Sequence, residues 1–259
     1  MTAKVAASKT ARQPLNDWDR RVECAAVCRA LALRGWDDMA EQFVAVRCES
    51  RRRAFLMYEY GTFLEEVRAS ELSVWDFDGS TERQNDVELN PGTHNVTVGV
   101  FDRRPEAVCA LHLHTRPIVG VSLLEEGLLP VCHPAFLIRR SLAYVDYVAD
   151  EEKSSGFREA HAERVGDAKV VIARNHGAYI YASSGAEAFF LAHNLVQACE
   201  VQLDVLASGR AFTMLDEKTE AVIRKDLDKC LDYNYRWDGS REWKGLLRRL
   251  DREAQGYDT

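Results

Sequence analysis

Three histidines in this chain have a spacing that suits a divalent metal ion. His112 and His114 are two positions apart where an apolar run ends, and His176 precedes Gly177 after a second apolar run. Residues i and i+2 of a strand project to one face, so both imidazoles of the pair can reach one ion. Three imidazoles suit Zn(II), Fe(II), Co(II) or Ni(II) and leave positions open for substrate. The alternative is that the pair His112 and His114 lies at the surface by chance or is a satisfied core pair, and that His176 belongs to an ordinary turn.

Two buried strands must position these histidines. The apolar run Ala107–His112 predicts a strand that ends at the histidine pair, and the near-continuous apolar run Lys169–Ala173 predicts another that ends shortly before His176. Gly177 would let the backbone pass close to the group that His176 binds. We therefore expect the three imidazoles at the mouth of one sheet.

The rest of the chain alternates predicted helices with short strands. A helix capped by Asn16 is expected over 17–34, and Thr93 is expected to cap a helix over 95–103. Further helices are predicted over 117–126, 184–206 and 217–231, and further strands over 42–47, 54–58 and 72–77. This order predicts an α/β fold with a mixed sheet flanked by helices.

Composition limits the class of protein. The 259 residues, 46% hydrophobic and 29% charged, predict one domain over 16–252, a disordered N-terminal tail over 1–15 and a C-terminal tail over 253–259. The net charge of -7 and the scattered basic residues argue against nucleic acid. No apolar stretch approaches the roughly 20 residues of a membrane span, and residues 1–14 lack the apolar core of a secretory signal. Seven cysteines, an odd number, favour reduced thiols and a cytoplasmic protein.

Several segments, in this order and spacing, resemble the class II aldolase/adducin family. The resemblance covers about residues 17–251 and is closest to the adducin-like bacterial branch. Its motifs are ALHLHT at 110–115, GLLP at 127–130, AYVDY at 143–147, RNHG at 174–177, AEAFF at 186–190, CEVQ at 199–202 and WKGLLRRLD at 243–251.

The resemblance implies a three-layer αβα fold around a central mixed sheet, in a subunit that is usually part of a homotetramer. It also implies one divalent metal ion, Zn or Fe(II), bound by His112, His114 and His176. In the aldolases this ion acts as a Lewis acid on a small carbonyl substrate while a C–C bond breaks.

Two candidate catalytic histidines lie where this sequence departs from the aldolases. His94 lies within one residue of the position of the aldolases' proton-handling glutamate, so it could act as a base or a fourth ligand, or be a partly exposed helix-start residue. His133 lies near the position of a tyrosine that the aldolases contribute to the neighbouring subunit, so it could line the pocket or be solvated. Tyr147 reads as a core or interface aromatic, and His161 and His193 as helix-surface residues.

The aldolases' phosphate-binding turns are also altered. The matching segments here are EQFVA at 41–45 and EYGT at 59–62, where a carboxylate and bulky side chains replace the hydroxyls and backbone amides that bind phosphate. We therefore expect a substrate without phosphate. Phe43 and Tyr60 would favour an aromatic or apolar substrate body.

Three functions fit this sequence. The first is a metal-dependent lyase that cleaves a C–C bond of a non-phosphorylated hydroxy- or keto-carbonyl compound. The second is a non-heme Fe(II) oxygenase of the aminocoumarin antibiotic type, which oxidatively decarboxylates a prenylated 4-hydroxyphenylpyruvate, an α-keto acid, to a benzoate. The third is a non-enzymatic, adducin-like interaction module, which the absent glutamate favours and the three retained histidines oppose.

Overall fold

The computed structural model describes residues 16–81, 88–147, 156–232 and 238–259, and its strands form one mixed sheet. The sheet of the described residues has seven strands in the order β3-β2-β1-β4-β7-β6-β5. All neighbours are antiparallel except β5 and β6. The expected tail over 1–15 lies outside the described residues. The strands are β1 (Phe43–Arg47), β2 (Ala54–Met57), β3 (Ser73–Asp76), β4 (Cys109–Leu113), β5 (Leu142–Asp146), β6 (Val170–Arg174) and β7 (Gly177–Ala182).

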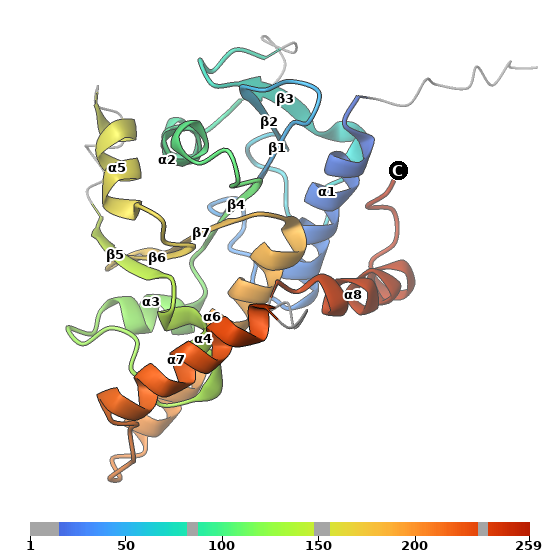
Figure 1. The fold of residues 1–259 in the computed structure, drawn as a ribbon. Coiled ribbons are helices and arrows are strands. Elements are labelled where there is room, and N and C mark those ends of the chain that lie inside the picture. The colour runs from blue at the N-terminus through green and yellow to red at the C-terminus, as the bar shows by residue number, and fades with distance from the viewer. Residues whose placement is uncertain (1–15, 82–87, 148–155, 233–237) are drawn as a thin grey trace, which may run out of the picture.

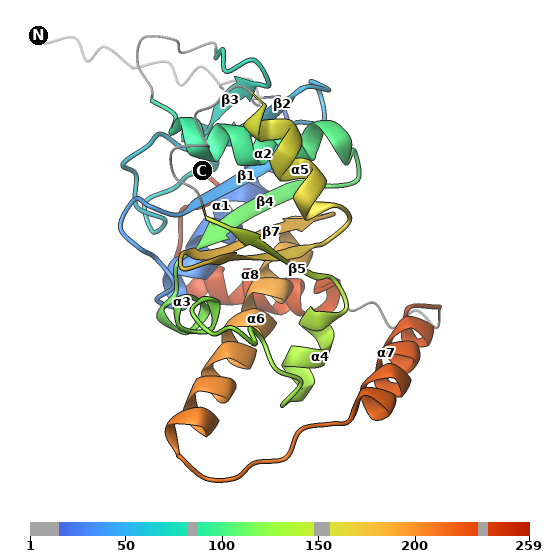
Figure 2. The ribbon, with the colours of Figure 1, turned by 90° about the vertical axis from the view of Figure 1, so that its left-hand side faces the viewer.

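Helices cover both faces of this sheet. In Figures 1 and 2, α2 and α5 lie on one face, and α1, α6 and α8 lie on the other. Helix α1 packs against β1, and α6 packs against β4 and β7. This confirms the three-layer αβα arrangement. The helices are α1 (Trp18–Leu33), the 3₁₀ turn η1 (Ala69–Glu71), α2 (Pro91–Arg103), α3 (Arg116–Ser122), α4 (His133–Arg139), α5 (Phe157–Val165), α6 (Gly185–Ala207), α7 (Glu217–Asp232) and α8 (Ser240–Glu253).

The central strands are buried on both faces because their sequences are almost wholly apolar. Strands β4 and β7 are buried along their full length, and β1 and β6 are buried except at their last residue. Such strands are typical of a sheet enclosed between two helical layers. The core therefore extends on both sides of the strands that lead to the histidine cluster.

Two predicted helix caps are wrong. Helix α1 is preceded by Asp17 instead of Asn16, and the Asp17 carboxylate accepts a hydrogen bond of 2.7 Å from the backbone N–H of Ser50. Helix α2 begins earlier than predicted because Asn90, not Thr93, caps it, and proline suits the first turn that follows. The helix predicted over 117–126 ends at residue 122.

The C-terminal residues set apart as a tail pack onto the domain. The backbone N–H of Ala69 donates to the carbonyl of Tyr257 at 2.9 Å, and Ser70 N–H donates to Thr259 at 3.0 Å. Tyr257 is buried, and its hydroxyl donates to the Asp251 carboxylate at 2.9 Å. No helix in the described parts of the chain is long and apolar enough to cross a membrane.

Candidate metal centre

Two strands and one tight turn bring the three histidines together. His112 lies within β4, His114 follows the end of β4, and His176 lies in the turn that joins β6 to β7. Since β4 and β7 pair antiparallel, with His112 opposite Tyr179, the end of β4 meets the start of β7. Asn175 has a φ of 60° in this turn, a conformation that asparagine adopts more readily than most residues.

The ring nitrogens of these residues converge on one point. Nε2 of His176 lies 3.0 Å from Nε2 of His112 and 3.1 Å from Nε2 of His114. For comparison, bonds of about 2.0 Å to a tetrahedral Zn(II) place ligand nitrogens roughly 3.3 Å apart. In the described chain, these histidines form the one cluster of three or more potential metal ligands.

The other ring nitrogens fix which tautomer two of these histidines adopt. Nδ1–H of His112 donates to the carbonyl of Ala178 at 3.0 Å, and Nδ1–H of His114 donates to the Asp38 carboxylate at 3.0 Å. Because a neutral imidazole has only one N–H, a hydrogen on Nδ1 leaves the lone pair of each ring on Nε2. The single N–H that His176 could carry satisfies only one of these two lone pairs. The donor set therefore fits a cation between the three nitrogens.

Burial and repulsion from neighbouring histidines favour the uncharged form of His112 and His176. Burial, with repulsion from His114 and His176, holds the pKa of His112 well below its usual value of 6.5. Burial and His114 lower the pKa of His176 to about 4. The neutral imidazole is the form that binds a metal, so both residues are ready as ligands at neutral pH.

Gly177 permits the close approach of the two segments. A Cβ atom at this position would lie 2.4 Å from the carbonyl oxygen of Leu113 and 2.7 Å from Cδ2 of His114. Any larger residue must therefore push the turn that carries His176 away from the end of β4. The structure therefore shows a close approach of Gly177 to the end of β4, and its approach to a group bound by His176 stays a prediction.

Asp38 supports the centre and was missed by sequence reasoning. Its loop is held by Gln42, whose side-chain oxygen accepts from the backbone N–H of Asp38 and whose Nε2 donates to the Met39 carbonyl at 2.9 Å. Tyr58 donates to the Gln42 carbonyl at 3.0 Å. Asp38 and His114 are 76 residues apart in sequence and lie in no shared motif, so no local pattern indicates their contact.

Tyr147 also contacts the centre. Its ring stacks on that of His176 with 3.8 Å between the centroids and a 12° angle between the planes. The residue is 39% exposed, so it covers one side of His176 while still facing solvent. Sequence reasoning assigned it to the core or an interface, whereas the structure places it beside a candidate ligand.

His94 is not brought together with the three histidines. It is buried on α2, where Nη2 of Arg158 donates to its Nδ1 at 2.9 Å and its Nε2–H donates to the Asp76 carbonyl at 3.2 Å. Burial is the main cause that lowers its pKa. Both ring nitrogens are engaged, so catalysis as a base would require release of the Arg158 contact. The reading of His94 as a partly exposed residue is wrong.

His133 also lies apart from the three histidines within the subunit. It is exposed at the start of α4 and lines a groove that none of the three metal-ligand candidates lines. A role at the metal centre would require the His133 of a neighbouring subunit, as the family resemblance implies.

Of the two histidines assigned to helix surfaces, His161 is wrongly assigned and His193 lies at the surface of α6. His161 is buried, and its Nε2 lies 2.9 Å from the Tyr181 hydroxyl, which donates to the Val96 carbonyl at 3.2 Å. His193 is half-buried, with its Nδ1 at 3.0 Å from Nη2 of Arg34. Both contacts join residues far apart in the sequence, so the helix pattern alone could not predict them.

Comparisons of sequence identify relatives over nearly the whole chain. Residues 22–203 match the family described as Class II Aldolase and Adducin N-terminal domain. A Caulobacter vibrioides protein whose name refers to aldolase class 2 is 32% identical over 242 residues, which are 93% of this chain and 92% of that protein. Alpha-adducin of Mus musculus is 34% identical over 252 residues, which cover 92% of this chain but only 34% of the adducin.

Solved structures with the same fold include an aldolase II superfamily protein from Pseudomonas syringae. It is 26% identical, with a TM-score of 0.85 over 98% of this chain and 100% of that one. L-fuculose 1-phosphate aldolase from Glaciozyma antarctica PI12 has a TM-score of 0.76 at 17% identity, over 98% of this chain and 96% of that one. The family match, the identities and the shared fold agree that this chain belongs to the class II aldolase/adducin family.

Proposed function

We propose that this protein is a metal-dependent lyase that cleaves a C–C bond of a non-phosphorylated hydroxy- or keto-carbonyl compound. The observation that carries the proposal is the convergence of three Nε2 atoms, two of them with lone pairs fixed toward the same point. His112, His114 and His176 would hold the ion. When bound, a divalent metal supplies Lewis-acid polarisation of the substrate's carbonyl and hydroxyl oxygens.

The residues around the three histidines define how they work. Asp38 and the Ala178 carbonyl hold two imidazoles in the tautomer and orientation that a metal ligand needs. Tyr147 packs flat on His176, which restricts rotation of that ring. We propose His133 from a neighbouring subunit as the candidate for proton transfer. His94 stays a candidate only if its Arg158 contact is released and it moves toward the centre.

The altered phosphate region supports a substrate without phosphate. The two segments that bind phosphate in the aldolases do meet here, but the Tyr60 hydroxyl donates to the Glu41 carboxylate at 3.2 Å. The Gln42 side chain is engaged in the Asp38 loop. An exposed carboxylate at this position repels a phosphate dianion. The expectation that Phe43 contacts the substrate is corrected, because its ring is buried and packs on His112.

The adducin relatives support one other function. A non-enzymatic interaction module would need the surface of this fold but no metal, and mouse alpha-adducin is as similar in sequence as the bacterial relative. Stoichiometric metal binding together with turnover favours the lyase, whereas a protein that binds neither metal nor carbonyl compounds favours the module. The names of the bacterial and mouse relatives refer to aldolase class 2 and to adducin, and neither name supports the oxygenase.

Matched substrate pairs test the proposal. L-fuculose and ribulose would be compared with fuculose 1-phosphate and ribulose 5-phosphate, alongside an arylpyruvate, by calorimetry and turnover on metal-loaded protein. Metal-free H112A is the control. We expect binding or turnover for at least one unphosphorylated compound. Turnover confined to the sugar phosphates would refute the substrate class and favour a sugar-phosphate aldolase.

We also propose that the protein is a cytoplasmic homotetramer. In the described residues the cysteines are free and, except for Cys132, buried, as expected in a reducing compartment. A tetramer would let the exposed His133 approach a neighbouring metal centre. Light scattering at micromolar concentration should give four times the subunit mass, and a monomer would contradict this proposal.

A further inference from the structure

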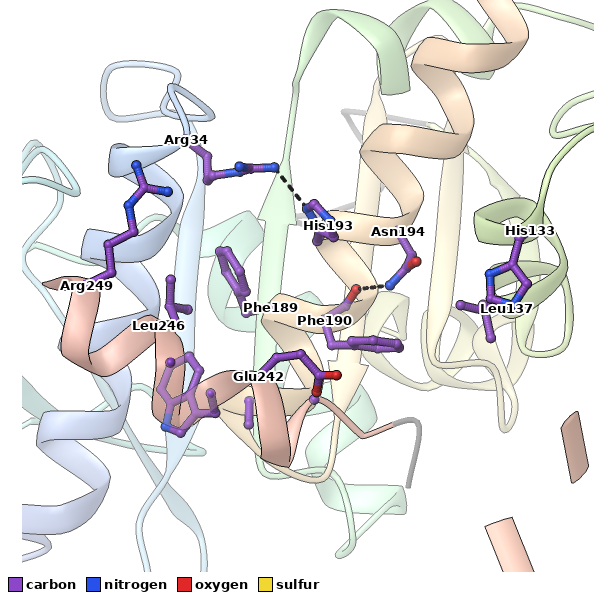
Figure 3. Close-up of a pocket in the computed structure, with 14 residues that line it drawn as sticks. Arg34, His133, Leu137, Phe189, Phe190, His193, Asn194, Glu242, Leu246 and Arg249 are labelled. Carbon is purple, nitrogen blue, oxygen red and sulfur yellow. Dashed lines mark hydrogen bonds between the residues drawn. The ribbon is translucent and has the colours of Figure 1, made fainter. Parts of the chain in front are cut away.

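A concave site away from the three clustered histidines lies among α4, α6 and α8. It is a groove of about 520 Å³ bordered by α4, α6 and α8, a volume within the range of roughly 300–1,000 Å³ that is typical of small-molecule pockets. None of the three clustered histidines lines it. Figure 3 shows its residues, which are Arg34, His133, Leu137, Ala186, Phe189, Phe190, His193, Asn194, Gly239, Glu242, Trp243, Gly245, Leu246 and Arg249.

The middle of this groove is apolar and aromatic. Phe189 and Phe190 come from α6, and Trp243 and Leu246 come from α8. In Figure 3, Phe189 and Phe190 lie between the arginines at one end and His133 with Leu137 at the other, and Leu246 lies near Arg249. Flat aromatic side chains bury a planar apolar molecule well and lose little conformational freedom.

One end of the groove is cationic. Arg34 and Arg249 lie at the same end in Figure 3, with the guanidinium of Arg34 directed at His193. Nη2 of Arg34 lies 3.0 Å from Nδ1 of His193, and Nε of Arg249 donates to Glu253 at 2.9 Å. Each guanidinium has further N–H donors that bind no group in the described part of the chain. Two such forks at one rim suit a carboxylate.

The neighbouring histidine adds a donor. Arginine can only donate, so Nδ1 of His193 accepts from Arg34 and the ring hydrogen lies on Nε2. Burial and the charge of Arg34 lower the pKa of His193, in agreement with a neutral ring. Trp36 lies 5.1 Å below the Arg34 guanidinium and holds it in place.

Glu242 limits the charge that a ligand can carry. It lines the same groove and lies away from the arginines, beside the aromatic middle, in Figure 3. A second carboxylate on the ligand would meet this like charge. The groove therefore suits one negative charge at the arginine end and an apolar body beyond it.

We propose that this groove binds a small organic acid with a flat apolar body and a single carboxylate. The body lies on Phe189, Phe190 and Trp243, and the carboxylate is bound by Arg34 and Arg249. Within one subunit this site is separate from the metal centre, and its aromatic middle and arginine end do not include His133, the residue proposed to approach a neighbouring centre. The proposal does not depend on the lyase activity.

Calorimetry with matched probes tests the ligand class on the full chain. The probe is 1-naphthylacetate, compared with the neutral 2-(1-naphthyl)ethanol, with acetate and with the dianion 1-naphthylsuccinate. We expect the naphthyl monoacid to bind about tenfold or more tightly than the alcohol, the size of one charge-assisted contact. Acetate and the dianion should bind more weakly than the monoacid. Equal binding of the alcohol, or no binding of the monoacid at millimolar concentration, would overturn the proposal.

Arginine variants test the location. R34Q and R249Q should each weaken naphthylacetate binding by about fivefold or more. R248Q should leave naphthylacetate binding unchanged, because Arg248 is exposed on α8 and does not line the groove. H112A should also bind the probe normally, because the metal centre is not involved. Thermal unfolding would establish that each variant is folded. Loss of binding in H112A, or unchanged binding in both groove variants, would show that the probe binds elsewhere.

Discussion

Replacement of Gly177 by alanine tests whether the turn before β7 sets the geometry of the metal centre. The added Cβ would lie 2.4 Å from the Leu113 carbonyl oxygen, about 1 Å short of ordinary contact, which begins at 3.4 Å. The Leu113 carbonyl belongs to backbone that is fixed by the pairing of β4 with β7, so it has little room to yield. The turn that carries His176 must move instead.

This movement should affect both stability and metal affinity. Overpacking of a buried contact costs about 1–3 kcal/mol, and each kcal/mol lowers Tm by roughly 2–4 °C in a domain of this size. A displacement near 1 Å exceeds the tolerance of about 0.5 Å expected of a binding site. We therefore expect G177A to bind Zn(II) or Co(II) about 10- to 100-fold more weakly than wild type, the range seen when ligand-orienting groups are lost.

Chelator competition measures this affinity, and the absorption spectrum of bound Co(II) reports the ligand geometry. G245A on α8 is the control, because beyond its own helix backbone and chain neighbours the described residues place only Nη2 of Arg248 near the added Cβ, at 3.7 Å. Alanine should stabilise that helix by up to about 1 kcal/mol and leave metal affinity unchanged. Wild-type stability and affinity in G177A would refute the argument that close approach at this glycine shapes the centre.

Three further predictions concern the centre and the core. H112A and H176A should each lose most bound metal by elemental analysis while keeping a native circular dichroism spectrum, and full occupancy in either would contradict the ligand assignment. D38N should weaken metal binding about 10- to 100-fold because His114 loses its carboxylate partner. An unchanged metal affinity would show that Asp38 does not orient His114. Burial lowers the pKa of His161 to about 4, so the unfolded chain binds more protons between pH 6.5 and 4. His161 alone should lower the free energy of unfolding by up to about 3 kcal/mol as pH drops through this window, and urea titrations should show a correspondingly smaller fall in H161Q.

The sequence predicted the layers and most of the elements that carry the site. Apolar runs indicated β4 and β6, because strands buried on both faces have few polar residues. The long apolar periodicity over 184–206 indicated α6, which spans Gly185–Ala207. Strand β7 was missed because it follows β6 through a turn of only two residues. His176 and Gly177 read as the end of the preceding strand, so the sequence predicts no new strand after them.

Other elements lacked a clear periodic signal. Helix α5 (Phe157–Val165) has mostly charged and small residues, yet it buries Phe157 and His161 against the sheet. Strand β5 was noted only as part of a family motif, since it pairs with a single neighbour and is only partly buried. Helices α4 and α8 were not predicted, although the family motif over 243–251 lies within α8.

The candidate site was predictable only in its ligands. The histidine pair has a local signature, and the third histidine shares its strand-end context. Asp38, Tyr147 and the groove at Arg34 depend on contacts between segments far apart in sequence, and no local spacing encodes these contacts. The contact of His94 with Arg158, which lies 64 residues further along the chain, is likewise not encoded by any local spacing.

The supports around the three histidines bear on the choice between lyase and interaction module. A module needs stable packing, and a neutral histidine packs equally well with its hydrogen on either ring nitrogen. Here the Ala178 carbonyl and the Asp38 carboxylate both select the tautomer that directs the Nε2 lone pair of a histidine toward His176. Lone pairs that face one another are unfavourable unless a cation or a proton lies between them. This arrangement is costly for a purely structural cluster and suits a metal ligand set, so metal occupancy of the wild-type protein separates the two functions.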